Sequence, residues 1–540
     1  MGFQDFTFII LPLFLLSSLI SSTSGSENFI SCLTTVSDSS MANILYSPNN
    51  SSYTSILDFS IQNRVFITST TPKPQFIITP LQESHIQAAV ICSKKLGYQI
   101  RVRSGGHDYE GLSYLSYHPY VIIDLVNFQD INVNIEENSA WVHAGATIGQ
   151  VYYRIAEQSN THGFPGSVCP TVGVGGLIGG GGLGFLWRKY GLSADNVLDA
   201  YIIDVNGTLL NRESMGEDLF WAIRGGGGSS FGVIVAWKIQ LVEVPAIVTV
   251  FRLAKTLEQG ATNLFHMWQN VAHTLPKDLL IRTIIQPVQG NNGRTIQVTF
   301  ESTFQGRLEA LLPIMENSFP ELGLKAEDCT EMSWVNSTLF VDGLSGPVDI
   351  LLNRSLPSKN FFKAESDFVK QPISILDLES IWNVMLSADG DISPQMITEP
   401  MGGRMAEISE SSTPFPSRKG NLYNIQYFLT WENASATPRF VEAARRLYNF
   451  NAPFVSKSPR ATYVNYRDLD LGVNKDVNTS YEEARVWGES YFGANFERLA
   501  LVKSVVDPEN YFWNEQSIPP FAPTRCCIKI RSTKNVMQNL

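Results

Sequence analysis

The chain has 540 residues, a formal net charge of −11 and a hydrophobic content of 44%. This charge argues against nucleic acid as a partner, because a basic face supplies much of the affinity for phosphate backbones. The length predicts two or more domains, since single hydrophobic cores stop growing at roughly 250–300 residues. The hydrophobic content is that of a globular protein, without internal repeats or low-complexity segments.

The N-terminus has the pattern of a secretory signal. An apolar run from Phe6 to Leu15 is followed by small residues from Ser17 to Gly25, although no Lys or Arg precedes the run. The run is too short to span a bilayer, which takes about 20 residues. We therefore expect residues 1–25 to be a signal peptide, and we expect no segment of the chain to cross a membrane.

Glycosylation sequons fit a secretory route, and we expect only some to carry glycans, because such triplets also arise by chance. They begin at Asn49, Asn50, Asn206, Asn336, Asn353, Asn433 and Asn478. The six cysteines include no C-x-x-C pair, and no H-E-x-x-H segment occurs. We therefore expect no metal site.

Short strands and helices alternate over the first part of the chain. Strands are predicted at 76–80, 99–103 and 120–125, hairpins at 131–143 and 198–210, and helices at 29–45, 84–96, 146–158 and 216–223. Residues 232–244 have the pattern of a strand pair, closed by Pro245. We assign residues 26–245 to a first domain.

The pattern changes after Val248. Strands are predicted at 249–253, 279–288, 295–301, 362–369 and 424–430, and helices at 257–274, 306–317, 373–387 and 439–450. This order predicts an α+β domain over 246–474, an antiparallel sheet with helices on one face. Helices at 481–492 and 495–506 are expected to return to the first domain within 475–525. A tail, 526–540, carries Cys526 and Cys527.

Glycines gather in two segments. Residues 164–196 read FPGSVCPTVGVGGLIGGGGLGFLWRKYGLSADN, and residues 101–111 read RVRSGGHDYEG. Glycine costs backbone entropy, so such runs indicate that main chain approaches a ligand closely. One cysteine, Cys169, and one histidine, His107, lie within these segments.

Each feature alone has an ordinary explanation. A lone cysteine is usually a small buried hydrophobe, and a lone histidine is usually a satisfied core or surface residue. Gly179, Gly181 and Gly184 also match a dinucleotide-binding fingerprint. No apolar strand leads into these glycines, however, so we reject a Rossmann domain.

Together the two segments resemble the berberine bridge enzyme-like (reticuline oxidase-like) family of plant FAD-linked oxidoreductases, which includes the cannabinoid synthases. The resemblance extends from about Phe29 to Pro520, with further motifs at 215–228, 463–470 and 507–520. It implies a two-domain α+β FAD-binding fold of the vanillyl-alcohol-oxidase/PCMH type, with a substrate domain built on a helix-covered antiparallel sheet. It also implies a disulfide between Cys32 and Cys92, which suits an oxidising compartment.

The resemblance implies FAD bonded to the protein twice. His107 matches the histidine bonded to the flavin 8α-methyl group, and Cys169 matches the cysteine bonded to flavin C6. Two such bonds are expected to raise the flavin potential and to favour hydride removal. The other implied FAD-binding residues are Arg103, Ser104, Gly105, Gly106, Val172, Gly173, Gly175, Gly176 and Asn514.

The catalytic positions are also carried over from the family. Tyr466 matches the base, and Arg282 matches an arginine that some members place across the site, where a cation lowers the pKa of a phenol from its ordinary value near ~10. Gln426 stands where berberine bridge enzyme has a catalytic glutamate, and an amide cannot take a proton. Asn424 likewise replaces a glutamate of the cannabinoid synthases. Gln426 and Tyr109 fit the monolignol-oxidising branch.

Two positions depart from the family pattern. Leu177 replaces a histidine that touches the flavin pyrimidine edge, and Leu183 replaces an aromatic residue of the substrate pocket. These changes either weaken the redox function or reshape the pocket for a bulky apolar substrate. Val172 stands at the oxygen-gate position, where a smaller side chain goes with oxygen use.

We expect a monomeric FAD oxidase of the secretory pathway, either extracellular or vacuolar. A phenolic, prenylated phenol, alcohol or alkaloid substrate would give a hydride to flavin N5, with oxidative cyclisation included, and O2 would be reduced to H2O2. A non-redox pericyclase, like the plant Diels–Alderases that resemble this family, remains the first alternative because of Leu177 and Leu183. A carbohydrate oxidase remains the second.

Overall fold

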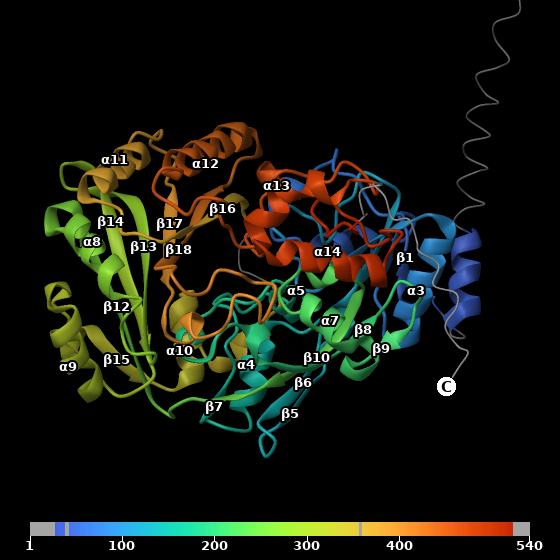
Figure 1. Ribbon diagram of the computed structural model, residues 1–540, viewed down its shortest axis with the longest axis horizontal. Helices are drawn as coiled ribbons and strands as arrows, with labels where there is room; N and C mark the ends of the chain where they lie inside the picture. Colours follow the sequence, from blue (N-terminus) through green and yellow to red (C-terminus); the bar gives the residue numbers. More distant parts are fainter. Residues whose placement is uncertain (1–26, 38–40, 42, 356–358, 522–540) are drawn as a thin grey trace, which may run out of the picture.

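The described part of the chain forms two bodies of sheet and helix that lie side by side (Figure 1). The computed structural model describes residues 27–37, 41, 43–355 and 359–521. A large sheet with helices on its outer face occupies one side of the molecule, and smaller sheets with the C-terminal helices occupy the other. Both glycine-rich segments belong to the side with the smaller sheets.

The first small sheet is mainly parallel, with strand order β1-β2-β4-β3. Its strands are β1 (Leu45–Tyr46), β2 (Phe76–Ile78), β3 (Gln99–Arg103) and β4 (Tyr120–Asp124), and its helices are α2 (Tyr53–Phe59) and α3 (Glu83–Leu96). All of β4 is buried. Its continuous apolar sequence follows from this burial, because parallel sheets are covered on both faces. The loop after β3 carries His107.

The second small sheet is antiparallel, with strand order β5-β6-β10-β8-β9. Its strands are β5 (Ile131–Asn134), β6 (Ser139–His143), β8 (Val197–Ile203), β9 (Leu209–Leu210) and β10 (Val233–Gln240). The associated helices are α4 (Ile148–Ala156), α5 (Val174–Gly179), α6 (Trp187–Tyr190) and α7 (Arg212–Ile223). A capping box between Thr147 and Gln150 begins α4.

The large sheet is antiparallel, with strand order β15-β12-β14-β13-β17-β18-β16. Its strands are β12 (Val248–Thr256), β13 (Leu279–Gly290), β14 (Gly293–Phe304), β15 (Cys329–Met332), β16 (Phe361–Val369), β17 (Gln395–Pro400) and β18 (Tyr423–Trp431). The register pairs Gly290 with Gly293, so β13 and β14 form one long hairpin.

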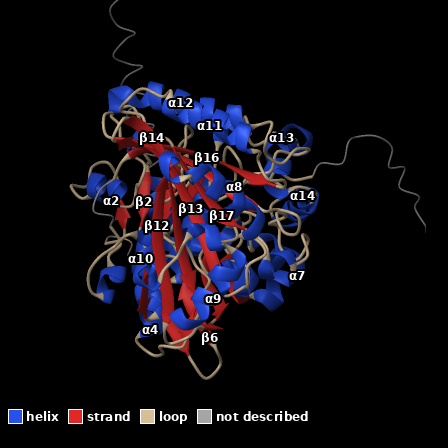
Figure 2. Cartoon of the chain, turned by 90° about the vertical axis from the view of Figure 1, so that its left-hand side faces the viewer, coloured by secondary structure: helices blue, strands red, loops and turns tan. Residues whose placement is uncertain are grey.

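Helices cover one face of this sheet, as the view in Figure 2 shows. They are α8 (Ala261–Val271), α9 (Leu308–Ser318), α11 (Ile375–Leu386) and α12 (Thr437–Asn451). Buried aromatic residues fill the interface: the rings of Phe265 and Trp268 stack 5.3 Å apart, and Trp268 donates to the Ile281 carbonyl over 2.8 Å. Side chains alternate along a strand, so Ile281 packs under the helices while Arg282 is free to point to the opposite face.

A buried arginine connects the two bodies. Arg188, on α6, is fully buried and donates to the carbonyls of Leu275 over 2.7 Å and Met401 over 3.1 Å. Burial lowers the pKa of Arg188 to about 10. Because its guanidinium spans main-chain groups of the large-sheet side, the glycine-rich segment that carries α6 is held against that side.

The C-terminal helices pack against the N-terminal part of the chain. They are α13 (Tyr481–Phe492) and α14 (Asn495–Val506), and α14 contacts α7. The Lys503 ammonium is fully buried, lies 2.7 Å from the Asp507 carboxylate and donates to the Ser230 carbonyl over 2.6 Å. The predicted domain limits at 245 and 474 remain a prediction.

Several predicted elements differ from the structure. The expected helix 29–45 is helical to residue 37 and is followed by β1. Within 232–244, β10 and β11 (Val242–Glu243) do not pair with each other, because β11 pairs with the distant β7 (His162–Gly163). Strands β15 and β17 and helix α10 (Trp334–Asp342) were not predicted. The strands are short, and non-local pairing leaves no periodic pattern in the sequence.

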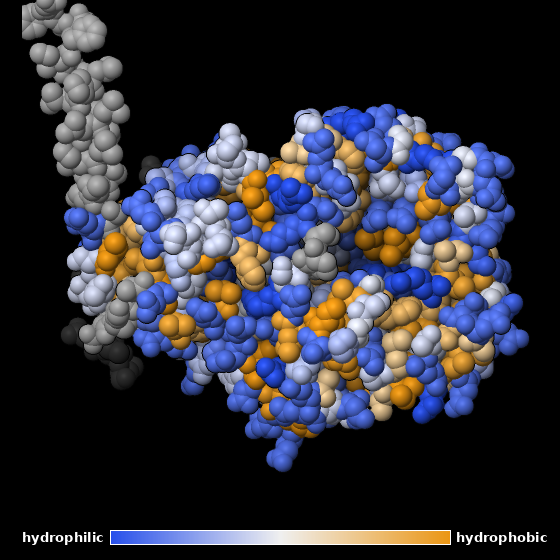
Figure 3. All heavy atoms as spheres, turned by 180° about the vertical axis from the view of Figure 1, so that it is seen from behind, coloured by the Kyte–Doolittle hydropathy of each residue, from blue (hydrophilic) through white to orange (hydrophobic). Residues whose placement is uncertain are grey.

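All the sequon asparagines that were predicted to be glycosylated are exposed, which a glycan requires: Asn49, Asn50, Asn206, Asn336, Asn353, Asn433 and Asn478. On the face shown in Figure 3, hydrophobic residues are dispersed among hydrophilic ones. Across the described ranges, no helix combines the length and the apolar character that a membrane crossing demands. The predicted signal peptide and the Cys526 and Cys527 pair lie outside the described residues.

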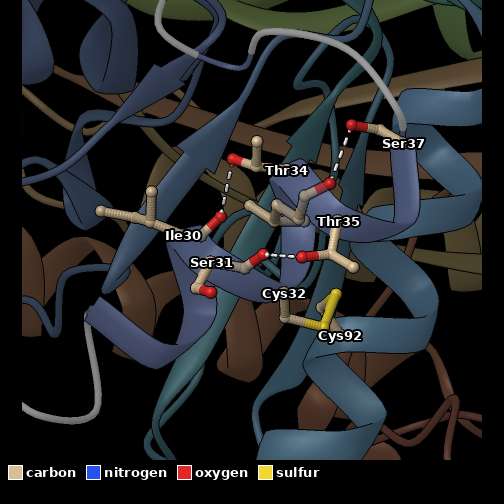
Figure 4. Close-up of a disulfide and its surroundings, with 8 residues drawn as sticks. Ile30, Ser31, Cys32, Thr34, Thr35, Ser37 and Cys92 are labelled. Atoms are coloured by element: carbon tan, nitrogen blue, oxygen red, sulfur yellow. Dashed lines mark hydrogen bonds between the residues drawn. A yellow bond between two sulfur atoms is a disulfide. The ribbon is translucent and has the colours of Figure 1, made fainter.

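The predicted disulfide is present. Cys32, in the helical segment 27–37, is bonded to Cys92 of α3 with an S–S distance of 2.06 Å (Figure 4). The bond closes a loop with a sequence separation of 60. It therefore fixes the first described helical segment to the helix that leads into β3 and the His107 loop.

Removal of this disulfide should destabilise the protein. A Cys32→Ser/Cys92→Ser double variant leaves no unpaired thiol at the site, and loop entropy predicts a loss of about 4 kcal/mol of unfolding free energy. Chemical denaturation of the purified holoenzyme measures this loss. Cys329→Ser, at a cysteine without a disulfide, serves as the control and should cost much less. Equal stability of the double variant and the wild type would contradict the prediction.

Candidate active site

A cavity of about 510 Å³ lies where the glycine-rich segments meet the large sheet. Its lining comes from the loop after β3, from the segment around α5, from β13, β17 and β18, and from residues 463–467. The volume falls within the range of ligand pockets, about 300–1,000 Å³. Segments far apart in the sequence therefore build one site.

The two glycine-rich segments touch through their backbones. A Cβ added to Gly105 would overlap the Gly173 nitrogen and would lie 3.0 Å from the Thr171 carbonyl oxygen. A Cβ on Gly173 would in turn overlap the Gly105 nitrogen and the Ser104 hydroxyl. Only glycine fits at both positions. This contact brings the loop of His107 against the loop of Cys169.

One hydroxyl lies between the two residues predicted to bond FAD. The Thr171 hydroxyl is 2.9 Å from His107 Nε2 and 3.4 Å from Cys169 Sγ. Burial lowers the pKa of His107 to about 4, so this imidazole is neutral at physiological pH. Burial raises the pKa of the Cys169 thiol to about 11. Both groups are therefore uncharged.

Tyrosines form one wall of the cavity. The rings of Tyr109 and Tyr466 stack with centroids 5.8 Å apart and an interplanar angle of 4°, and Tyr463 meets Tyr466 edge-on at 5.0 Å. Gln426 donates to the Tyr109 hydroxyl over 2.8 Å. Tyr466 lines the cavity, and its hydroxyl makes no hydrogen bond with any described residue. It is thus available to a bound molecule.

Arg282 faces the same cavity but does not lower the net pKa of Tyr466. Burial raises that pKa well above its ordinary value, and the charges of Glu399 and of neighbouring tyrosines add to the rise, while Arg282 acts weakly in the opposite direction. The Arg282 guanidinium is also bonded to the Glu301 carboxylate, with Nε 2.6 Å from Oε2. The expected effect of the cation has the right direction, but burial of the phenol outweighs it.

The cavity collects the predicted site residues with one exception. Its lining includes Tyr466, Arg282, Gln426, Tyr109, His107, Cys169, Ser104, Gly105, Gly106, Val172, Gly173, Gly175, Gly176 and Asn514. Arg103 is not among the lining residues. Its guanidinium is fully buried: Nη2 lies 2.6 Å from Asp124 and donates to the Ile56 carbonyl, and Nη1 donates to the Leu57 carbonyl, whereas Nε makes no hydrogen bond with a described residue.

The two leucines that depart from the family pattern are buried in the cavity wall. Leu177 and Leu183 are each 6% exposed. The Leu177 carbonyl accepts a hydrogen bond from Asn465 over 3.0 Å, and Asn465 also donates to the Tyr463 hydroxyl. The backbone is therefore fixed to the tyrosine motif while both side chains present an apolar surface.

The lining includes three carboxylates to which the sequence analysis gave no role. Asp108 stands in the motif of His107 and pairs with Arg467 at 3.1 Å, and the other two come from distant elements. Asp342 ends α10, and Glu399 lies on β17. Neither element was predicted, so no pattern placed these side chains near Tyr466. The hydroxyl of Thr171 was also missed, although it stands inside the Cys169 motif, two residues from the cysteine.

A separate cluster of three carboxylates lies elsewhere in the described structure. Oxygens of Glu365, Asp468 and Asp470 come within 4.8 Å of one another. The Lys363 ammonium is 2.6 Å from Asp468 and 3.3 Å from Asp470. A protein cation therefore supplies countercharge to this cluster.

Family models match two parts of the chain that line the cavity. Residues 74–212 match the FAD binding domain, and residues 462–519 match the domain described as berberine and berberine like. The chain is also 52% identical over 524 residues to a tetrahydroberberine oxidase of Berberis wilsoniae, covering 96% of this chain and 98% of that protein. The chain belongs to the berberine bridge enzyme-like family. It is an FAD-linked oxidoreductase with the two-domain α+β fold of PCMH type.

Other relatives carry different names. The chain is 49% identical over 505 residues to a monolignol oxidoreductase of Arabidopsis thaliana, covering 91% of this chain and 93% of that protein. Among solved structures, Phl p 4, a grass pollen allergen with glucose dehydrogenase activity, is 45% identical with a TM-score of 0.87, and the match covers 92% of this chain and all of that one. Its isoleucine-to-valine variant is named a glucose oxidase.

The cavity fits FAD. The FAD domain match spans both glycine-rich segments. A methyl group on Gly176 would meet nothing within 4 Å, so main chain is open to a ligand there. Backbone N–H groups of such glycine loops are suited to a pyrophosphate.

The glycine contact yields a stability prediction. Gly105→Ala forces the two segments apart and should cost about 1–3 kcal/mol of unfolding free energy, the usual range for overpacking. It should also weaken flavin retention, read from the visible absorbance of the purified protein. Gly390→Ala, at an exposed glycine with nothing within 4 Å, is the control. A fully stable, fully flavinylated Gly105→Ala protein would refute the role given to the contact.

Proposed function

We propose that this protein is an FAD-dependent oxidase that acts on a phenolic, prenylated phenol, alcohol or alkaloid substrate, with O2 as the electron acceptor. The observation that carries the proposal is the Tyr466 hydroxyl, which makes no hydrogen bond within the described residues and lines the same cavity as His107 and Cys169. A free hydroxyl beside two nucleophilic side chains suits a site in which a held cofactor meets a substrate.

We assign the covalent attachment of FAD to His107 and Cys169. FAD, when bound, supplies a two-electron acceptor for hydride removal. His107 Nε2 is directed to the Thr171 hydroxyl, whereas Nδ1 makes no hydrogen bond to a described residue. A neutral imidazole keeps a lone pair on one ring nitrogen. The lowered pKa of His107 keeps this ring neutral, which supports formation of a covalent bond between that nitrogen and FAD.

Tyr466 is the residue proposed to contact the substrate and to take its proton. Gln426 fixes Tyr109, and Tyr109 supports Tyr466 by stacking, so the phenol is held in one orientation. Because burial raises the pKa of Tyr466, the phenol is protonated at neutral pH. Activity that depends on its ionised form should therefore increase as pH rises.

The proposal of O2 as acceptor is supported by Val172, which lines the cavity. Phl p 4 is named a glucose dehydrogenase, and its isoleucine-to-valine variant is named a glucose oxidase. A valine at the gate position therefore favours oxidase activity in this chain. The names of the Phl p 4 structures also keep a carbohydrate substrate as a second candidate.

A non-redox pericyclase is the other candidate. Leu177 and Leu183 present buried apolar side chains to the cavity, where the family carries a histidine and an aromatic residue. Such a surface would hold a bulky apolar substrate in a fixed conformation. The two leucine side chains would make no polar contact with the cofactor. The oxidase is preferred because the Tyr466 hydroxyl remains free.

We further propose that the chain acts as a monomer in the secretory pathway, outside the cell or in the vacuole. The Cys32–Cys92 disulfide supports an oxidising compartment. The exposed sequon asparagines are compatible with glycosylation on that route.

Covalent attachment can be tested by acid precipitation of the purified holoenzyme. We expect flavin colour to stay in the pellet of the wild type and of the single variants His107→Ala and Cys169→Ala. We expect it to be released only from the double variant, because each single variant keeps one bond. Thr171→Val, which removes the hydroxyl between them, should retain the colour. Release of flavin from the wild type would contradict bicovalent attachment.

The role of Tyr466 can be tested by anaerobic stopped-flow reduction. Tyr466→Phe should slow flavin bleaching by about 100-fold or more, as expected for loss of a general base, and should abolish the rise of the rate with pH. Tyr463→Phe, which removes a hydroxyl already bonded to Gly182, is the matched control. The substrates are tetrahydroberberine, a monolignol and glucose, taken from the names of the relatives.

The same experiment separates the candidate functions. Bleaching by glucose alone would favour the carbohydrate oxidase. Absence of bleaching by a broad panel of phenols, alcohols and alkaloids, with product formed in the absence of O2, would overturn the oxidase in favour of the pericyclase.

A further inference from the structure

The cluster of three carboxylates lies between β16 and the segment that follows Tyr466. One oxygen from each of Glu365, Asp468 and Asp470 lies within 4.8 Å of the other two. None of these three residues is among those that line the cavity. Because like charges at this distance repel one another, the cluster needs compensating positive charge.

Glu365 is the least satisfied member of the cluster. It lies on β16 and is 1% exposed, and neither of its carboxylate oxygens makes a hydrogen bond with a described residue. Burial raises the pKa of Glu365 to about 8, and the charges of Asp468 and Asp470 add to this rise. Buried carboxylates are normally paired, hydrogen-bonded or bound to a metal ion. Both oxygens of Glu365 are therefore available to a ligand at the cluster.

Asp468 has one oxygen that is bonded and one that is not. Oδ1 accepts hydrogen bonds from the Lys363 ammonium over 2.6 Å and from the Asp470 main-chain N–H over 3.0 Å. Oδ2 is buried and makes no hydrogen bond with any residue that the structure describes. Together with the two oxygens of Glu365, three buried carboxylate oxygens at this place are without a partner in the described fold.

Two basic side chains at the cluster are shared among four carboxylates. Lys363 donates to Glu110 as well as to Asp468, over 2.6 Å in both cases, and lies 3.3 Å from Asp470. Arg445, on α12, donates to both oxygens of Asp470 over 2.7 and 2.8 Å. When the cluster and Glu110 are fully ionised, two negative charges therefore remain uncompensated. A divalent cation supplies that charge.

Two neighbouring arginines do not supply it, because each is bonded to another carboxylate. Arg460 donates to both oxygens of Asp367, which lies two residues beyond Glu365 on β16, over 2.6 and 2.7 Å. Arg467 pairs with Asp108 at 3.1 Å. The excess negative charge thus remains at the cluster.

The donor atoms and their spacing select the kind of cation. Carboxylate oxygens suit Ca²⁺ and Mg²⁺, whereas softer metals prefer nitrogen or sulfur ligands. Oxygens bound to one Ca²⁺ lie up to about 5 Å apart, and those bound to one Mg²⁺ up to about 4 Å, twice the respective bond lengths. The 4.8 Å limit of the cluster therefore matches Ca²⁺. The Asp470 side chain is 34% exposed, which gives the cluster an edge for ion entry and for water ligands.

We propose that Glu365, Asp468 and Asp470 form a binding site for one Ca²⁺ ion. Both oxygens of Glu365 and Oδ2 of Asp468 would be ligands, and Asp470 would share an oxygen with Arg445 at the exposed edge. The ion would tie β16 to residues 463–470, which include Tyr466. The sequence analysis expected no metal site because the motifs that it considered contain cysteine or histidine. The inference does not depend on the proposed function.

Calorimetric titration of the EDTA-treated holoenzyme with CaCl2 tests the site. We expect one saturable site in the wild type and weaker binding of Mg²⁺. Glu365→Gln keeps the shape of the side chain and removes its charge. It should weaken Ca²⁺ binding by about tenfold or more, since even indirect contacts to a metal are worth about that factor. Because neither Glu365 oxygen is bonded in the described fold, the metal-free variant should have a Tm at least equal to that of the wild type.

Thermal unfolding gives a second readout. Ca²⁺ at 100-fold above its Kd should raise the Tm of the wild type by about 2–3 °C, because it binds only the native state. The Tm of Glu365→Gln should not rise at the same concentration. Glu379→Gln removes the same charge from an exposed position on α11 and should keep both the affinity and the Tm shift.

Three results would overturn the proposal. They are the absence of Ca²⁺ binding and of a Tm shift in the wild type, tighter binding of Mg²⁺ than of Ca²⁺, and equal Ca²⁺ affinity of the wild type and Glu365→Gln. Equal affinity would mean that Ca²⁺ binds only to surface carboxylates of a chain with a net charge of −11. Flavin bleaching by substrate is measured separately, so each of these results leaves the proposed oxidase untouched.

Discussion

The backbone contact between Gly105 and Gly173 is the constraint on which the site depends. No side chain fits at either position, so the loop after β3 and the loop before α5 lie directly against each other. Thr171 then stands beside both His107 and Cys169. The two candidate attachment residues lie on loops of separate sheets. Without this contact, the two loops would not be held against each other. The glycines are therefore required by packing as well as by any cofactor.

The second requirement is that the glycine-rich body be held against the large sheet. Arg188 does this from one end of the glycine segment, through main-chain carbonyls of the opposite side. Asp195, a little further along the same end of that segment, pairs with the fully buried Arg418 at 2.7 Å. Because these partners are buried, the interface is fixed in register, and β13, β17 and β18 present their inner face to the glycine loops. The cavity is the space left between them.

The cavity combines an apolar, aromatic surface with ionisable side chains. Tyr109, Tyr466 and the two leucines provide the surface, while Asp342 and Glu399 provide negative charge near a guanidinium that Glu301 already occupies. Burial keeps His107, Cys169 and Tyr466 neutral at physiological pH.

Side-chain periodicity in the sequence indicated the α+β class of the second domain. Long motifs indicated the family, and the resemblance to that family in turn implied the FAD-linked activity, the disulfide and most cavity residues. It assigned Arg103 to the cofactor and expected Arg282 to lower the pKa of Tyr466. In the structure Arg103 pairs with Asp124, and burial of Tyr466 outweighs the effect of Arg282. Strand β17, with Glu399, and helix α10, with Asp342, gave no recognisable pattern. Only the tertiary structure decided which charges face the cavity, since pairing and desolvation depend on residues far apart in the chain.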